Sequence, residues 1–368
     1  MQIADFTLER YFARWEFAVR HVLCASDVEP VGLAELLALA DDDSRRRWDS
    51  LRLGYTESLG LPALRAEIAG LCPGLTADDI IVFAGAEEGV FLCMHALIGK
   101  GDHAVVAWPA YQSLHEVARS AGGSVTLVPL DQRDWSLEVD AVAAAMRPNT
   151  KVIVVNSPHS PTGAQLAPEQ LHRLVALAEQ HGAFLFSDEV YRFLEHDAPP
   201  LPPAATLSPR GVSLGVMSKA FGLAGLRIGW LALRDAPLRA RIASLKDYTT
   251  ICNSAPSEIL ALAALRAKDA LLARTREIVA ANLSILDGFF ARNAGRFSWV
   301  RPRASSVGFP KLIGHDVDDF AARLVEREGV LILPASQFGY PGNHFRLGFG
   351  RRDMPEALGA LERFAKTG

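Results

Sequence analysis

One lysine lies between two apolar segments of the chain, where burial of a charged amine costs the most. Lys219 is part of VMSKAFGLAGLRIG (216–229), and apolar runs at 213–217 and 227–233 flank it. The other lysines lie among polar residues or at expected element ends. A desolvated amine has a lowered pKa and is a competent nucleophile toward an aldehyde. The position of Lys219 therefore indicates a covalent tether for an aldehyde.

A carboxylate closes another apolar run. Asp188 belongs to SDEVY (187–191), which follows the apolar segment AFLF. A carboxylate at the buried end of a strand is costly unless a cation meets it. Asp188 could equally cap a following helix. If Asp188 lies beside the Lys219 amine, the interpretation as a buried carboxylate that meets a cation is the one that bears on function.

Two further features suit a phosphate group. Gly85 and Ala86 follow an apolar run that ends at Phe83, and they lead into an expected helix that begins with Glu87. The N–H groups at a helix N-terminus are unpaired and lie at the positive end of its dipole. Arg227 adds a planar guanidinium. Small residues between a strand and a helix are common in proteins that bind no ligand there. This turn therefore indicates a phosphate site only together with the other motifs.

A polar turn completes the constellation. NSPHSPTG (156–163) follows the apolar run KVIVVN and presents Asn156, His159 and Ser160 at a strand end. Alone it would be a structural turn. Together, an amine, an acid, an anion cradle and a hydrogen-bonding turn are what pyridoxal phosphate (PLP) requires. Its aldehyde needs an amine, its phosphate needs N–H donors, and its ring nitrogen needs an acid.

These motifs resemble those of the class I/II aminotransferases, which are fold-type I PLP-dependent enzymes. The resemblance runs from about residue 55 to residue 346, and SDEVY and SKAFGLAGLRIG carry most of it. It implies that Lys219 is the Schiff-base lysine and proton shuttle, and that Asp188 partners the pyridine nitrogen. It further implies a cofactor contact for each of Tyr191 (3′-oxygen), Tyr111 (ring stacking), Arg227 (phosphate) and Tyr55 (phosphate of the neighbouring subunit).

The resemblance also places the substrate. Arg346 in HFRLGFG matches the arginine that binds the α-carboxylate with two hydrogen bonds. Selection of the substrate side chain would fall to Trp15, the segment 25–33, His159 and Arg351, although Trp15 could equally belong to the core. The remaining residues expected around the cofactor are Gly85, Ala86, Glu87, Asn156, Ser160 and Ser218. We expect no metal site.

Three positions depart from the family pattern. Ser160 stands where the family's N-P-T-G turn has asparagine, so a water or a neighbouring side chain would have to assist the shorter serine. Val216 stands where the family often has a phosphate-binding serine, which leaves Ser218 or backbone groups to compensate. Ala335 in PASQFG occupies the usual glycine position of a Pro-Gly loop. These changes predict an altered site geometry, and with it room for an altered reaction.

The elements that position these residues follow from hydrophobic patterning. Short apolar runs separated by helical stretches indicate buried strands in a parallel-type sheet covered on both faces. Such sheets bind ligands at the carboxyl ends of their strands. The strands are expected at 79–83, 103–108, 124–130, 151–156, 183–188, 213–217 and 227–233.

The rest of the chain is expected to form a smaller α+β domain. Periodicity predicts helices at 6–23, 62–71 and 316–328 and a long helical region at 256–294. The polar run 41–47 is interpreted as the end of a helix. The expected fold is therefore α/β, a fold-type I PLP transferase. Residues 45–280 would form the large PLP-binding domain, and residues 1–44 with 281–368 the small one.

Composition excludes other classes. The 368-residue chain has a formal net charge of −4 and a pI near 6.2, which gives no electrostatic footprint for nucleic acid or a membrane surface. No apolar run is long enough to span a membrane, and the N-terminus does not read as a secretory signal. Four scattered cysteines are typical of reduced thiols in a cytoplasmic protein.

The expected function is PLP-dependent transamination between an α-amino acid and a 2-oxo acid, in two half-reactions. The alternative is a PLP-dependent lyase or cyclase that acts on the amino acid's side chain, as in antibiotic biosynthesis. Tyr55 acting across an interface would make the protein a homodimer. We do not expect a transcription regulator, because the chain has no basic N-terminal region. We do not expect a nicotinamide-binding protein either, because no GxGxxG follows an early strand.

Overall fold

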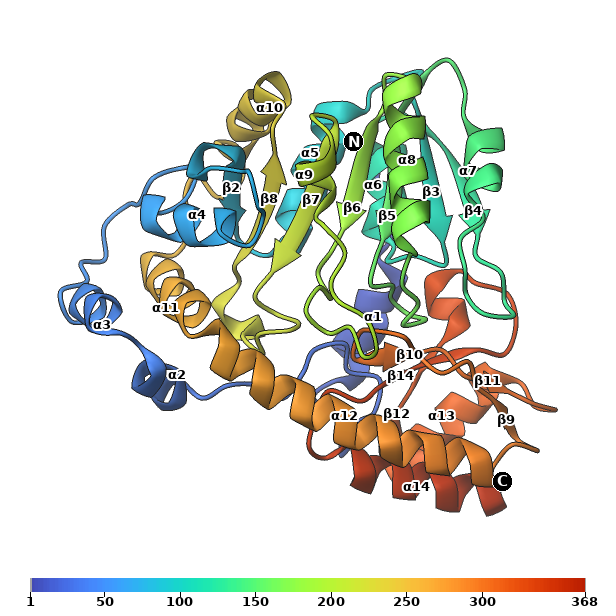
Figure 1. Cartoon of the computed structure of the whole chain (residues 1–368). Helices are drawn as coiled ribbons and strands as arrows, with labels where there is room; N and C mark the ends of the chain where they lie inside the picture. Colours follow the sequence, from blue (N-terminus) through green and yellow to red (C-terminus); the bar gives the residue numbers. More distant parts are fainter. Residues whose placement is uncertain (1, 368) are drawn as a thin grey trace.

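A seven-stranded sheet forms the centre of the protein, for which a computed structural model describes residues 2–367. Its strand order is β2-β8-β7-β6-β5-β3-β4, and Figure 1 shows it in the upper half of the molecule. β8 runs antiparallel to both of its neighbours, whereas the pairs from β7 to β4 are parallel. This confirms the predicted α/β fold with a large, mainly parallel sheet. The strands are β2 (Ile80–Phe83), β3 (His103–Trp108), β4 (Ser124–Pro129), β5 (Thr150–Asn156), β6 (Phe184–Asp188), β7 (Gly211–Val216) and β8 (Gly229–Leu233).

Side chains of the central strands alternate between two cores. Val105 and Ile153 belong to one apolar cluster, and Val106 and Val154 belong to another on the opposite face. Strands that are covered on both faces have no polar side, which explains their continuous apolar sequence. One face is covered by α5 (Ala86–Leu97), α6 (Ser113–Ser120) and α10 (Ala236–Lys246), and the other by α7 (Val139–Ala145), α8 (Pro168–Gln180) and α9 (Ala204–Leu207).

The C-terminal third packs below the carboxyl ends of the strands in Figure 1, together with the N-terminal helix α1 (Thr7–Trp15). Its short strands form a three-stranded antiparallel sheet, β10-β14-β13, and two small pairs, β1 with β12 and β9 with β11. The helices of this part are α12 (Lys268–Arg292), α13 (Val317–Glu328) and α14 (Met354–Thr367), and its strands are β1 (His21–Val22), β9 (Phe297–Ser298), β10 (Val307–Gly308), β11 (Lys311–Leu312), β12 (Val330–Leu331), β13 (Leu333–Pro334) and β14 (Phe345–Gly348).

Four helices link the two parts along the side of the sheet that carries β2. α2 and α3 form an arm at the left of Figure 1, and α4 and α11 lie between this arm and the sheet. They pack in one cluster with residues of β2 and β8. Three short 3₁₀ turns complete the described elements. The bounds are α2 (Leu33–Leu39), α3 (Asp42–Asp49), α4 (Pro62–Ala69) and α11 (Ala255–Arg266), with η1 (Ala77–Asp79), η2 (Ala224–Leu226) and η3 (Ala335–Phe338).

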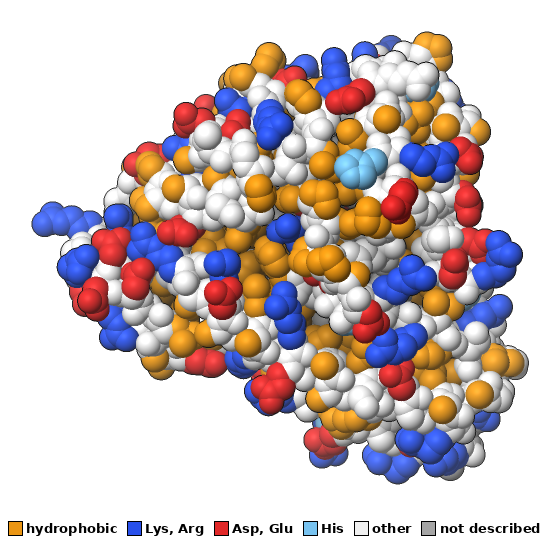
Figure 2. Space-filling view, viewed as in Figure 1, with side chains coloured by type: hydrophobic (Ala, Val, Ile, Leu, Met, Phe, Trp, Pro, Cys, Tyr) orange, Lys and Arg blue, Asp and Glu red, His pale blue; other side chains and the backbone are white. Residues whose placement is uncertain are grey.

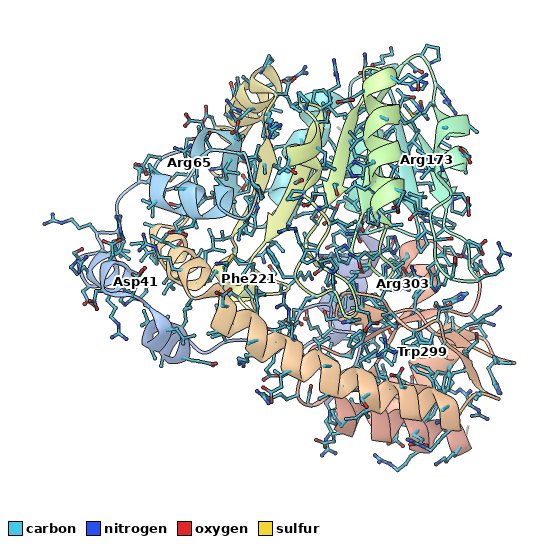
Figure 3. All side chains as sticks on the ribbon, in the orientation of Figure 1. Asp41, Arg65, Arg173, Phe221, Trp299 and Arg303 are labelled. Carbon is cyan, nitrogen blue, oxygen red and sulfur yellow. The ribbon has the colours of Figure 1, made fainter. Side chains whose placement is uncertain are left out.

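Two expectations about local structure are wrong. The helix predicted at 6–23 ends at Trp15, because His21 and Val22 pair instead with β12. The polar run 41–47 begins a helix rather than ending one. The carboxylate of Asp41 accepts a hydrogen bond from Ser44 N (2.7 Å) at the start of α3, and its position on the arm is labelled in Figure 3.

The surface carries both signs of charge. Figure 2 shows Lys and Arg interspersed with Asp and Glu over the face that it presents. Among residues 2–367, no helix combines the length and apolar character needed to cross a membrane. The predicted division into two domains stays a prediction, and its boundary at residue 280 falls inside the continuous helix α12.

Candidate active site

The predicted site residues converge on one cavity of about 550 Å³. It lies between the carboxyl ends of the central strands, helix α1 and the C-terminal part. Twelve of the residues named from the sequence line it: Ala86, Glu87, Tyr111, Asn156, Ser160, Asp188, Tyr191, Val216, Ser218, Lys219, Arg227 and Arg346. A parallel sheet brings this about because its strands end along one edge.

Lys219 lies in the loop after β7, and its amine points into this cavity. Its Nζ donates a hydrogen bond to Ser26 Oγ at 2.8 Å and lies 5.5 Å from the centre of the Tyr191 ring. The Tyr191 hydroxyl in turn donates to Ser26 O (3.0 Å). Ser26 therefore holds both predicted catalytic side chains, one through its hydroxyl and one through its carbonyl.

Asp188 ends β6 and is 7% exposed. Burial raises the pKa of its carboxyl from 3.8 to about 7, and a hydrogen bond from Val190 N and the charge of Lys219 oppose that rise. The carboxylate lines the same cavity as the Lys219 amine. The two groups therefore share one pocket, which the predicted chemistry requires.

Asn156 and Asp188 lie opposite each other in the β5–β6 register. Asn156 Nδ2 donates to Asp188 O (2.8 Å), and its Oδ1 accepts from Ser160 N (2.6 Å). The side-chain amide thus joins two strand ends to the NSPHSPTG turn. Asn156 therefore holds the turn in place, and the contact with the cofactor that was predicted for it stays a prediction.

Tyr111 stands on the wall formed by the loop before α6. Its hydroxyl donates to Glu9 Oε1, and its ring packs against Phe6 with a centroid separation of 4.9 Å. Glu87 lies on the same wall and accepts from Ser113 Oγ (2.9 Å). Burial raises the pKa of Glu87 to about 7, so this carboxyl is partly protonated at neutral pH.

The predicted phosphate cradle is built where three elements meet. Gly85 is the N-cap of α5 with φ +98°, a conformation that favours glycine. A Cβ at this position would lie 2.5 Å from a terminal nitrogen of Arg227, so the arginine covers the turn closely. Gly229 of β8 lets the backbone of the Gly85–Ala86 turn approach closely, since a Cβ at Gly229 would lie 2.6 Å from Ala86 N.

Arg346 on β14 is 2% exposed. Its Nε donates to Cys24 O (3.2 Å), and the guanidinium carbon lies 5.6 Å from the ring centre of Phe12. One terminal nitrogen has no hydrogen-bond partner within residues 2–367. A buried guanidinium nitrogen without a partner is costly, and a ligand carboxylate would satisfy it.

Besides Gly85, four of the candidate residues do not line the cavity: Trp15, His159, Tyr55 and Arg351, which bonds the carboxylate of Asp27. Trp15 lines a separate surface hollow between α1 and α13, where the guanidinium of Arg14 covers its ring at 4.5 Å, so its placement does not support a substrate contact. His159 bonds Thr162 Oγ1 (2.8 Å) behind the cavity wall, and burial lowers its pKa to about 4. Tyr55 is 92% exposed in the single chain, and its contact with a second subunit stays a prediction.

Ser26 and Asp27 of the segment 25–33, which was expected near the substrate, line the cavity. Sequence reasoning missed Glu9, Phe12 and Glu16 of the α1 segment, which line it too. The apolar periodicity of 6–23 indicates the helix but assigns no role to its glutamates. The spacing of Glu9, Phe12 and Glu16 by three and four residues was the available signal that they share one face.

The donor set of the cavity fits PLP. Lys219 offers an amine for the aldehyde, and Asp188 offers a buried carboxyl for the ring nitrogen. Arg227 and the backbone N–H groups at the start of α5 would hold the phosphate. Ser160 and Ser218 line the same space and are buried. In the described part of the chain, no group of three or more His, Cys, Asp or Glu could hold a metal ion.

Comparison with known proteins agrees with this geometry. The family model for aminotransferase class I and II matches residues 36–363. Capreomycidine synthase from Streptomyces vinaceus is 32% identical over 98% of this chain and 92% of its own length. A PLP-dependent aminotransferase from Streptococcus suis has a TM-score of 0.93 at 28% identity, with 100% and 99% of the two chains covered. The PLP-dependent cyclase OrfR has a TM-score of 0.91 at 30% identity, with 100% and 98% covered.

The family match spans most of the chain, and the relatives cover it almost from end to end. The cavity supplies the groups that this family needs. The protein is a PLP-dependent enzyme and belongs to the class I and II aminotransferase family.

Proposed function

We propose that the protein is an aminotransferase that moves an amino group between an α-amino acid and a 2-oxo acid. The observation that carries the proposal is one shared cavity for Lys219, Asp188 and the unpaired guanidinium of Arg346. An amine, a buried acid and a carboxylate binder are the three groups needed to seat an amino acid against PLP. The family match supports the reaction class.

Arg346 begins the reaction by binding the α-carboxylate of the substrate. Its guanidinium is held by Cys24 O and faces the cavity with a free N–H, so the substrate is fixed at one end before any bond changes. This contact orients the Cα–H bond of the amino acid relative to the Lys219 amine. Phe12 lines the cavity beside Arg346 and keeps water from the contact.

Lys219 then acts as the general base. Ser26 Oγ accepts a hydrogen bond from Lys219 Nζ and holds the amine in the cavity. From there the amine removes the α-proton of the substrate and keeps it for a second proton transfer. When bound, PLP supplies an aldehyde that captures the amino group and a ring that delocalises the electron pair left at Cα. Asp188 holds a proton at the ring nitrogen and so favours that delocalisation.

A second reaction is supported by specific observations. A lyase or cyclase shares the proton removal by Lys219, but the amino group stays on the substrate. Capreomycidine synthase and the cyclase OrfR match almost the whole chain. Ser160 and Val216, which depart from the family pattern, both line the cavity and alter the groups around the cofactor.

Two experiments test these proposals. Lys219→Ala should abolish turnover and remove the absorbance of the covalently held cofactor, because the variant has no amine for the aldehyde. An unchanged spectrum in Lys219→Ala would refute the assignment.

Incubation of the wild type with a panel of amino acids should form a 2-oxo acid and consume an added 2-oxo acid acceptor. Ammonia or a cyclic product without acceptor consumption would instead establish the second reaction.

A further inference from the structure

The cavity carries more ionised groups than the proposed reaction uses. Its basic residues are Lys219, Arg227 and Arg346, which serve the aldehyde, the phosphate and the α-carboxylate. Of its acidic residues, Asp188 serves the ring nitrogen. The carboxyls left over are Glu9, Glu16, Asp27 and Glu87. Among the described residues, the ionisable side chains of the cavity that have no assigned role are therefore all acidic.

These four carboxyl groups differ in the hydrogen bonds and ion pairs that the protein provides for them. Glu87 accepts from Ser113 and is partly protonated. Glu9 accepts from the Tyr111 hydroxyl. Asp27 accepts two hydrogen bonds from Arg351, at 3.1 and 3.0 Å. Glu16 is the one for which no side-chain hydrogen bond or ion pair is found within residues 2–367.

Glu16 is half-buried at the C-terminal end of α1, and its side chain lines the cavity. Burial raises the pKa of its carboxyl, the carboxylates of Asp27 and Glu9 add to the rise, and Arg351 and Arg346 oppose it. The protein thus leaves an anion in a partly desolvated wall without a direct partner. A cation that enters the cavity would remove this cost.

We propose that this part of the cavity binds a cationic side chain of the amino-acid substrate, with Glu16 as its principal counter-ion and Glu9 beside it. The inference rests on the proposed function, since Arg346 must hold the α-carboxylate for the side chain to point toward α1. A guanidinium or ammonium at the end of an aliphatic side chain is the ligand class that this arrangement favours.

The opposite substrate classes are disfavoured for electrostatic reasons. A carboxylate side chain would meet Glu9 and Glu16 at short range in a medium less polar than water, where repulsion is strong. An apolar side chain would cover the Glu16 carboxylate without pairing it, which costs free energy. The buried and unpaired Arg346 at the other end of the space gives the substrate its direction.

Binding of unreactive analogues to the cofactor-loaded protein tests the proposal. Deamino-arginine, hexanoate and adipate keep the carboxylate for Arg346, lack the α-amino group, and carry a cation, a methyl group and an anion at the far end. Isothermal titration should show that deamino-arginine binds about tenfold or more tightly than hexanoate, the range of a charge-assisted hydrogen bond. Adipate should bind most weakly.

Glu16→Gln should remove most of the preference for deamino-arginine, because deamino-arginine binds more weakly while hexanoate binds as tightly as before or more tightly. Glu169→Gln is the matched control, because Glu169 is an exposed carboxylate on α8 outside the cavity. Equal affinity of the wild type for all three analogues, or equal weakening of all three by Glu16→Gln, would overturn the proposal. Absence of any binding would count against the proposed function as well, whereas hexanoate binding without a cation preference counts against this inference alone.

Discussion

Asp188 is a carboxyl group whose chemistry depends on its surroundings. It is 7% exposed, and its pKa lies near 7 rather than 3.8 because burial disfavours the charged form. Burial makes the charged carboxylate of Asp188 unfavourable. It also strengthens the interaction of this carboxyl with a ring nitrogen, because the surroundings are less polar than water. Asn156, its neighbour in the β5–β6 register, uses its amide to join Asp188 O to Ser160 N.

The shifted pKa of Asp188 predicts how the stability of the cofactor-free protein depends on pH. Between about pH 4 and pH 7 the unfolded chain has lost the Asp188 proton while the folded protein still holds it, so stability falls as pH rises through this window. The contribution is at most about 4 kcal/mol. Asp188→Asn should flatten this part of the profile, measured by urea unfolding at several pH values.

The control for this experiment is Asp140→Asn. Asp140 is an exposed carboxylate on α7 that pairs with Arg173, whose position in the α8 region is labelled in Figure 3. Its replacement should leave the slope between pH 4 and pH 7 as in the wild type. The same slope in Asp188→Asn and the wild type would contradict the account of Asp188.

At the scale of elements, the phosphate cradle depends on how closely β8 approaches the start of α5. Gly229 is buried in β8 beside the Gly85–Ala86 turn, and a Cβ on it would lie 2.6 Å from Ala86 N and 2.7 Å from Gly85 C. Backbone atoms cannot yield as a flexible side chain can. The second glycine of the GLRIG segment is therefore a requirement of packing.

Gly229→Ala should displace the Gly85–Ala86 turn and weaken PLP binding by about tenfold or more, since overpacking of this kind costs about 1–3 kcal/mol. Equilibrium dialysis with PLP measures the change. Gly225→Ala is the matched control in the same motif, because a Cβ at Gly225 would meet nothing within 4 Å. Equal PLP affinity in the two variants would show that the close approach is not needed.

Helix α1 is the element whose role changed most between sequence and structure. It ends at Trp15 because β1 pairs with β12, and its residues Glu9 and Phe12 line the cavity at the strand ends. Trp15 points to a different hollow. A single helix thereby decides which side chains meet the substrate.

At the scale of the whole molecule, several large apolar side chains are left in solvent by the single chain. Tyr55, Leu53 and Tyr248 are 92%, 85% and 89% exposed. The face shown in Figure 2 carries hydrophobic side chains among charges of both signs. Burial of such side chains between two subunits would remove apolar surface from water, as the prediction that Tyr55 serves the site of a second subunit requires.

Mixed dimers test that prediction. Tyr55→Ala and Lys219→Ala should each be impaired as homodimers. If Tyr55 reaches the neighbouring site, a mixed dimer has one site with both residues intact and regains activity after the two variants are unfolded and refolded together. If Tyr55 acts within its own subunit, every site lacks one residue and mixing restores nothing. A monomer in sedimentation experiments would also contradict the prediction.

The sequence by itself determined the cofactor chemistry and the sheet. Lys219, Asp188 and Arg227 lie in short motifs whose residue types and spacing follow from the needs of PLP, and the sheet's continuous apolar strands are visible without any contact information. These features are local, so each can be read from a few adjacent residues.

Only the tertiary structure decided which residues surround the substrate. Ser26, Glu9 and Glu16 meet Lys219 and Arg346 across more than a hundred positions of sequence. Their identities carry no local mark, because a serine in a loop and a glutamate on a helix are ordinary in both. The pairing of β1 with β12 and the packing of α1 on the strand ends bring them together, and such long-range packing is a property of the folded chain as a whole.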